Sequence, residues 1–243
     1  MIRKWSPLLK SLVPYGEALL RLVYPAFCVL CRQALILEER ALCNGCYGKL
    51  KLLELPKLKS CKISAGGVIK EYLCLYGYKD ELKALWTQIK FKRRAWLMSV
   101  LKEPLQKFLL AVQPETRYDY LVPIPTTLRR KLERHYNQAE LLASQISALS
   151  GIPVIWALKK VLSTPAQRQL SREDRQSNLR NSFAVHGTPG RLRGSSVLLV
   201  DDIFTTGATA RECAQVIKRA GAEKIGIFTL AQTPKKIVAR LEE

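Results

Sequence analysis

Two adjacent carboxylates followed by a loop of small, hydroxylated residues are the part of this sequence best suited to chemistry. Asp201 and Asp202 come directly after the apolar run Val197–Val200. Small loop residues let backbone N–H groups close around one phosphate, and threonine hydroxyls donate further hydrogen bonds. Carboxylates repel a phosphate, so we expect these two to bind ribose hydroxyls or a divalent metal through water. The residues expected to hold the phosphate are Thr205, Thr206, Gly207, Ala208 and Thr209.

A strand and a helix must position this loop. Four apolar residues in a row are typical of a strand that is buried on both faces, and helical spacing runs from Ala210 to Ala220. Open α/β sheets bind ligands where a strand leads through a polar loop into a helix, and the helix adds its positive end. The sequence lacks Gly-x-x-x-x-Gly-Lys-[Ser/Thr], which argues against a P-loop.

The stretch Val197–Thr209 resembles the fingerprint of type I phosphoribosyltransferases. A hydrophobic strand, Asp-Asp, two further residues and Thr-Thr-Gly-x-Thr follow one another in this order. The resemblance implies an α/β fold in which helices flank a parallel sheet. It also implies that the chain binds phosphoribosyl pyrophosphate (PRPP) together with Mg²⁺. The alternative is a buried strand and a turn with a purely structural role.

A second loop upstream carries positive charge and hydroxyl groups. The segment Tyr120–Pro125 is typical of a strand that runs into a loop, and threonines and basic residues follow it. The resemblance implies that a loop after the first sheet strand holds the pyrophosphate, whose several negative charges match cationic side chains. The residues expected to contact the pyrophosphate are Thr126, Thr127 and Arg129.

Other segments complete the expected domain. The polar residues 163–182 are suited to a mobile lid over an anionic ligand, with an ordinary exposed connection as the alternative. Helical patterns cover residues 79–111 and 137–150, and Gly151 suits the position just past the second one. Strands are expected over residues 68–78, 153–161, 183–185 and 224–230.

Four cysteines near the N-terminus have the spacing of metal ligands. Cys28-x-x-Cys31 and Cys43-x-x-Cys46 form two knuckles that suit one tetrahedral Zn²⁺, with an iron–sulfur cluster as the alternative. Gly45 is expected to permit a tight turn in the second knuckle. Four protein ligands leave no open position on the metal, so a structural role is predicted.

The chain divides into two expected regions. Residues 1–66 hold an N-terminal amphipathic segment and the zinc-binding module, and residues 67–243 form the phosphoribosyltransferase-like domain. Seven cysteines in a cytosolic protein favour metal ligands and core thiols over disulfides. Outside the two knuckles, we expect ordinary buried thiols at Cys61, Cys74 and Cys213.

The composition is strongly basic. The 243 residues include 40 Lys and Arg against 20 Asp and Glu, a formal net charge of +20. This excess favours polyanionic partners, either nucleic acid or an anionic membrane surface. The apolar runs are too short for a membrane-spanning helix. The N-terminal apolar run is interrupted by Lys10, Pro14 and Glu17, which argues against a signal peptide. We therefore expect a cytoplasmic protein. Peripheral association with the inner face of the membrane is the alternative.

One segment combines basic and aromatic residues in the manner of a single-strand-binding surface. In Lys90–Trp96 the rings of Phe91 and Trp96 can stack on bases while the neighbouring cations follow phosphates. The alternative is a solvated helix face from which both rings point inward. The candidate nucleic-acid contacts are Lys90, Lys92, Arg93, Arg94, Arg130 and Arg134.

A four-cysteine module in front of a phosphoribosyltransferase domain resembles the ComF family of bacterial competence-related proteins. Agreement continues at Lys90-Phe91-Lys92, at Pro123-Ile-Pro125, at Asn137-Gln-Ala-Glu140 and from Thr164-Pro-Ala-Gln167 to Phe183, and covers roughly residues 25–232. Family members often have Gly-Phe where this chain has His135-Tyr136. The resemblance implies DNA uptake during natural transformation, with the uptake machinery or a helicase as partner.

Two functional hypotheses follow. In the first, the chain handles incoming single-stranded DNA, and its pocket binds PRPP or another phosphoribosyl ligand such as a nucleotide. In the second, it is an active Mg²⁺-dependent phosphoribosyltransferase that releases pyrophosphate from PRPP onto an acceptor that the sequence does not identify. The net charge of +20 and the Lys90–Trp96 segment favour the first.

Overall fold

The chain is described here from a computed structural model. The described residues are 24–51, 61–62, 67–91, 94–111, 117–127, 133, 136–161, 182–187 and 189–233. The predicted N-terminal amphipathic segment and nearly all of the polar segment 163–182 lie outside these residues. No helix within them is long and apolar enough to cross a membrane.

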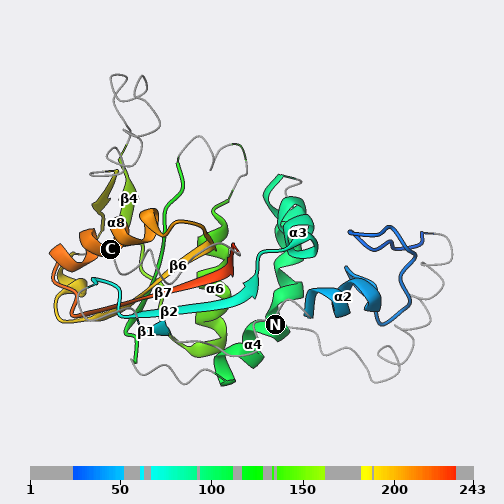
Figure 1. The fold of residues 1–243 in the computed structure, drawn as a ribbon, viewed down its shortest axis with the longest axis horizontal. Coiled ribbons are helices and arrows are strands. Elements are labelled where there is room, and N and C mark those ends of the chain that lie inside the picture. Colours follow the sequence, from blue (N-terminus) through cyan, green and yellow to red (C-terminus); the bar gives the residue numbers. More distant parts are fainter. Residues whose placement is uncertain are drawn as a thin grey trace, which may run out of the picture.

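A five-stranded sheet organises the chain, with the strand order β1-β2-β7-β6-β3 (Figure 1). β6 (Ser196–Phe204) lies between β7 (Lys224–Gln232) and β3 (Tyr120–Pro123), and it is parallel to both. β2 (Glu71–Gly77) extends the parallel sheet beyond β7, and the short β1 (Cys61–Lys62) adds an antiparallel edge. The predicted α/β fold class is therefore confirmed.

The two strands beside β6 end at different places. β3 pairs with β6 as far as Pro123 opposite Val200, whereas β7 continues from Thr229 opposite Asp201 to Gln232 opposite Phe204. The last hydrogen bond between the two segments is donated by the Ile124 N–H to the Val200 carbonyl at 2.9 Å, and the chain then turns away from β6. The sequence suggested that both aspartates follow the strand. They instead lie inside β6, before the loop begins. One side of this strand end is open for a site.

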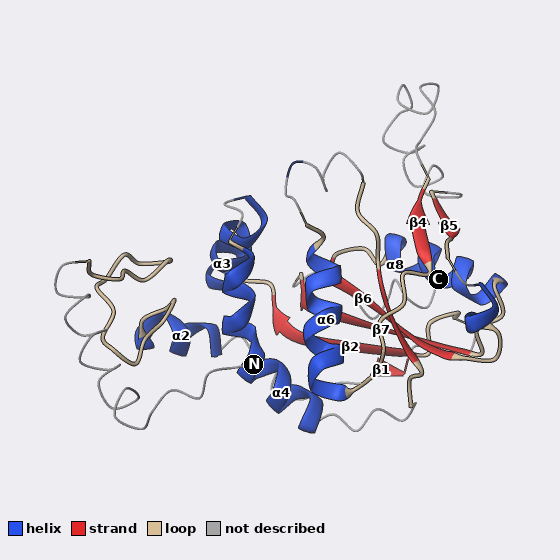
Figure 2. Cartoon of the chain, turned by 180° about the vertical axis from the view of Figure 1, so that it is seen from behind, coloured by secondary structure: helices blue, strands red, loops and turns tan. Residues whose placement is uncertain are grey.

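Helices cover both faces of the sheet (Figures 1 and 2). One face carries α3 (Asp80–Phe91), η1 (Ala95–Leu101), α4 (Lys102–Ala111) and α6 (Gln138–Ser150), which pack on Leu198 and Val200 among others. The helical pattern predicted over residues 79–111 is thus divided among several helices.

The opposite face carries α8 (Ala208–Arg219), which packs on Val197 and Leu199 of β6. A small antiparallel pair lies beside it, formed by β4 (Leu158–Lys160) and β5 (Phe183–Val185). The strand predicted over residues 153–161 is wrong in its first half. There, Val154 forms an isolated parallel bridge with Leu121, and the chain joins β4 only further on.

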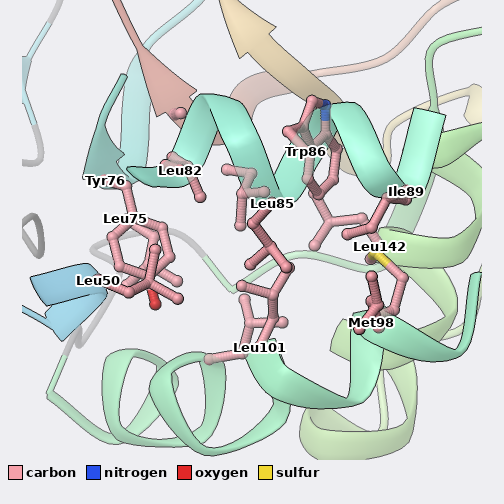
Figure 3. Packing of buried hydrophobic residues seen from close by; sticks show 14 of the residues in the cluster. Leu50, Leu75, Tyr76, Leu82, Leu85, Trp86, Ile89, Met98, Leu101 and Leu142 are labelled. Carbon is pink, nitrogen blue, oxygen red and sulfur yellow. The ribbon is translucent and has the colours of Figure 1, made fainter. Parts of the chain in front are cut away.

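The N-terminal cysteine segment shares its apolar core with α3. The helix α2 (Asn44–Lys51) places Leu50, which is 1% exposed, in one cluster with Leu75, Tyr76 and Leu82 (Figure 3). The boundary predicted near residue 66 falls outside the described residues and stays a prediction.

Candidate functional site

A cavity of about 370 Å³ opens at the carboxyl edge of the sheet, where β6 extends beyond β3. The end of β6, the chain that leaves β3 and the start of α6 form its walls. Single residues of α3, β4 and α8 complete it. The lining residues are Lys90, Ile124, Pro125, Thr126, Asn137, Gln138, Lys160, Asp201, Asp202, Ile203 and Thr209.

Asp202 is surrounded by donors from its own chain. Its Oδ1 accepts the Ile203 N–H at 2.7 Å, and its Oδ2 accepts the Trp86 indole N–H at 3.3 Å. The Lys90 ammonium forms an ion pair with the same Oδ2. Burial alone raises the pKa of Asp202, but the positive charge of Lys90 and these hydrogen bonds outweigh it and hold the pKa below its ordinary value. Asp202 is therefore a stable carboxylate.

Asp201 lies in a different environment. Its side chain accepts the Asp202 N–H at 2.8 Å, and it faces the α8 side of the sheet because successive strand residues alternate. Burial, and then the negative charge of Asp202, raise the pKa of Asp201 to about 8. Asp201 therefore keeps its proton to a higher pH than an ordinary aspartate does.

The predicted phosphate loop connects β6 to α8. Gly207 precedes α8 with a φ of 71°, a left-handed conformation that favours glycine. Thr205 and Thr206 are exposed, and the Thr206 hydroxyl accepts the Ala208 N–H at 3.4 Å. Thr209, in the first turn of α8, lines the cavity. Of the five predicted phosphate contacts, Thr209 is therefore the one that lines the cavity, and the others lie beside it at the positive end of α8.

The loop after β3 contributes to the same cavity. Thr126 lines it, and Thr127 follows as a partly buried residue. Arg129, Arg130 and Arg134 lie outside the described residues, so the predicted pyrophosphate and nucleic-acid contacts of these arginines stay predictions.

Several cavity residues were not among the predicted ligand contacts. Asn137 caps α6, because its Oδ1 accepts the Ala139 N–H at 3.1 Å and its Nδ2 donates to the Ile124 carbonyl at 3.0 Å. An asparagine before a helix is a recognisable cap signal, which could have linked this helix start to the loop. Lys160 reaches the cavity from β4, and no local pattern in the sequence indicates this.

The structure separates the members of the Lys90–Trp96 segment. Lys90 belongs to the cavity, whereas Phe91 is 65% exposed and Trp96 is 54% exposed. The alternative in which both rings point inward is therefore wrong. Arg94 is partly exposed between them, and Lys92 and Arg93 lie outside the described residues.

The four cysteines of the two knuckles converge on one point. Their Sγ atoms all lie within 4.8 Å of one another, which fits ligands around a single tetrahedral metal ion. The Cys46 N–H donates to the Cys43 Sγ at 3.5 Å, as suits a thiolate ligand. The donor set therefore fits Zn²⁺, and an iron–sulfur cluster uses the same ligands.

Local structure explains how each knuckle forms. The first is closed by a bridge between Phe27 and Ala34, with Arg32 at a φ of 68°. The second lies at the start of α2, whose Asn44 N–H donates to the Glu39 carboxylate at 2.5 Å. Gly45 is not in a left-handed conformation, and an added Cβ would meet its nearest neighbour at 4.0 Å. The prediction that Gly45 serves a tight turn is therefore wrong.

The remaining thiols that the structure describes are core residues. Cys74 is 5% exposed on β2 and Cys213 is fully buried on α8. Burial raises the pKa of both thiols, so they are inert packing groups, as the sequence predicted. The side chain of Cys61 is outside the described residues.

The parallel sheet, the paired aspartates and the threonine-rich loop at its carboxyl edge define a phosphoribosyltransferase-type domain. The family model described as "Phosphoribosyl transferase domain" matches residues 139–242. Three relatives match a larger share of the chain than this family model does.

Competence protein F of Haemophilus influenzae is 30% identical over 223 residues, which cover 84% of this chain and 96% of that protein. DNA utilization protein YhgH of Escherichia coli (strain K12) is 28% identical over 231 residues, or 87% of this chain and 99% of that protein. Competence protein ComFC of Bacillus subtilis (strain 168) is 28% identical over 167 residues, or 68% and 66% of the two chains. This chain belongs to the competence protein F (ComF) family.

Replacing one ligand of the metal centre should release the metal. Cys31 is exposed, so Cys31→Ser should not disturb the apolar core. It should lower the metal content below about one ion per chain, and the melting temperature should fall because the metal stabilises the fold. Elemental analysis and thermal denaturation measure both effects. Cys213→Ala, in the core of α8, is the control and should keep its metal. Full metal content in Cys31→Ser would contradict the assignment of this ligand.

The raised pKa of Asp201 predicts how stability depends on pH. An unfolded aspartate loses its proton near pH 4, whereas Asp201 in the folded chain keeps it up to about pH 8. The folded state therefore holds an extra proton between these values, and the free energy of unfolding falls as the pH rises through them. Asp201→Asn has no such proton to lose, so its free energy of unfolding should not fall in this way. The melting temperature of the variant minus that of the unchanged protein should therefore be larger at about pH 9 than at about pH 6.

The control for this measurement is Asp80→Asn, which removes an exposed carboxylate at the start of α3. Its melting temperature should follow that of the unchanged protein across the same pH range. If Asp201→Asn and the unchanged protein give parallel curves, Asp201 does not hold the extra proton.

Proposed function

We propose that this chain binds a phosphoribosyl ligand, such as PRPP or a nucleotide, and single-stranded DNA, and that it acts in the handling of DNA taken up during natural transformation. The proposal that the chain binds a phosphoribosyl ligand rests on one observation. Asp201, Asp202 and Thr209, at the start of α8, line the same cavity. The names of the relatives, competence protein F and DNA utilization protein YhgH, support the biological setting.

The cavity offers complementary groups for the two ends of such a ligand. Its volume of about 370 Å³ is in the range of small-molecule sites. Ribose hydroxyls can contact the aspartates on β6, while a 5-phosphate can approach the loop at the start of α8. Two lysines, Lys90 and Lys160, line the same cavity, and their positive charge favours an anionic ligand.

The Mg²⁺ implied with PRPP does not fit Asp202, because both oxygens of this carboxylate are already paired. Asp202 accepts the N–H groups of Trp86 and Ile203, and its Oδ2 forms an ion pair with Lys90. A divalent cation requires ionised oxygen ligands that are not already paired. We therefore assign Mg²⁺ no ligand on Asp202.

A negative charge in the proposed phosphate loop should weaken ligand binding. Thr205 is exposed, so Thr205→Glu should fold normally while its carboxylate repels the incoming phosphate. We expect PRPP affinity, measured by calorimetry, to fall at least tenfold. Ser144→Glu adds the same charge at an exposed position of α6 and should bind PRPP like the unchanged protein. Equal affinity in both variants would refute the loop assignment.

The second part of the proposal concerns the exposed rings of Phe91 and Trp96. Phe91 is the last residue of α3, and Trp96 is the second residue of η1, the next helix along the chain. Large exposed rings near cationic residues are the elements of a surface on which unpaired bases stack. The net charge of +20 supplies the long-range attraction for the phosphate backbone.

Removing these rings should weaken single-strand binding without changing its dependence on salt. Stacking on one aromatic ring contributes roughly 1–3 kcal/mol per base, so Phe91→Ala with Trp96→Ala should lower affinity for a labelled DNA strand at least tenfold. The slope of affinity against salt should stay the same, because the cations remain. Trp156→Ala removes a ring that is 57% exposed beside β4, and it is the control. Absence of DNA binding at low salt would exclude this part of the proposal.

The proposed role also implies a location. A protein that receives incoming single strands would work on the cytoplasmic side of the membrane, in contact with the uptake machinery or a helicase. The basic composition supports this placement, since both DNA and the inner membrane surface are anionic.

A further inference from the structure

The Lys90–Asp202 ion pair occupies the floor of the proposed ligand cavity. The two side chains are 17% and 20% exposed, and both line the cavity. The pair therefore joins the last turn of α3 to the end of β6, two segments that are far apart in the sequence. Because it is mostly shielded from water, its attraction is screened less than that of a surface pair.

Lys90 is held in this position by the packing of its helix. Leu85, Trp86 and Ile89 of α3 are at most 1% exposed and belong to the core on this face of the sheet (Figure 3). The Ile89 carbonyl, next to Lys90, accepts a hydrogen bond from the Tyr136 hydroxyl. The Trp86 N–H donates to the same Asp202 oxygen that pairs with Lys90. The buried side chains of α3 thus fix the position of the helix turn from which the Lys90 ammonium reaches Asp202.

The ammonium stands where a divalent cation would have to bind this carboxylate. A partly buried carboxylate needs a compensating positive charge, and Lys90 already provides it. A second cation at the same oxygen would face direct repulsion from the ammonium. Lys160, which lines the same cavity, adds a further positive charge to its wall. The described part of the cavity therefore contains its own cations.

We infer that Lys90 takes the place of a divalent cation in this cavity, so that the cavity binds a 5-phosphoribosyl ligand without one. This inference rests on the proposed function of the cavity and adds to it a specificity-determining residue. Lys90 fixes the charge and orientation of Asp202 toward the ribose. It also excludes the divalent ion from the carboxylate.

Calorimetry with and without Mg²⁺ tests the inference on the full-length, metal-loaded protein. The probes are ribose 5-phosphate and PRPP, in buffer that has been passed over a chelating resin, because a soluble chelator would attack the cysteine site. The unchanged protein should bind each probe with dissociation constants that agree within about twofold in the presence and absence of Mg²⁺.

The variant Lys90→Gln should acquire a dependence on Mg²⁺. Without the ammonium, Asp202 lacks its counter-ion, so binding in resin-treated buffer should weaken at least tenfold and recover when Mg²⁺ is added. Lys90→Arg keeps the charge and should stay independent of Mg²⁺. The matched control is Lys83→Gln, an exposed lysine on the same helix, which should bind as the unchanged protein does.

Three results would overturn the inference, and they can be told apart. If the unchanged protein binds only with Mg²⁺, Lys90 does not replace the cation. If Lys90→Gln binds like the unchanged protein in both buffers, Lys90 has no part in ligand binding. If the unchanged protein binds neither probe in either buffer, the proposed function of the cavity fails and the inference fails with it. The unchanged protein tests the inference even if Lys90→Gln does not fold.

Discussion

The site depends on a difference in length between two neighbouring strands. β3 stops at the level of Val200, while β6 stays paired with β7 through Phe204. The end of β6 is therefore anchored along one side and open along the other. The residues Val197–Val200 are at most 4% exposed, so this strand cannot shift without disrupting the cores on both faces of the sheet. A rigid strand end of this kind holds functional side chains more closely than a loop does.

The alternation of a strand gives two neighbouring carboxylates opposite properties. Asp202 follows Leu198 and Val200 on the face covered by α3, and there it meets Trp86 and Lys90. Asp201 follows Val197 and Leu199 on the face covered by α8. The pKa of Asp202 is held low because Lys90 outweighs its burial, whereas burial and the charge of Asp202 raise the pKa of Asp201. One cavity thus contains a fixed negative charge beside a carboxyl group whose pKa is raised.

The cysteine module is joined to the rest of the chain by apolar packing and not only by sequence. Leu50 of α2 packs in the core that α3 shares with the sheet, and the Tyr47 hydroxyl donates to the Glu103 carboxylate of α4 at 3.0 Å. A segment of this size buries little apolar surface, so a metal held by four thiolates would supply much of its stability. Because α3 also carries Lys90, the same helix contacts both the module and the ligand cavity.

The sequence by itself determined the features that are local. The run Val197–Val200, the twin aspartates and the threonine-rich loop indicated a strand, a site and a helix, and the cysteine spacing indicated one metal centre, because each depends on residues close together in the chain. The tertiary structure decided what depends on distant segments. It moved Lys90 from a predicted DNA contact into the cavity, brought in Lys160, and exposed Phe91 and Trp96. Helical periodicity shows that one face of α3 is buried, but which charge meets the last turn of that helix depends on the strand that packs beside it.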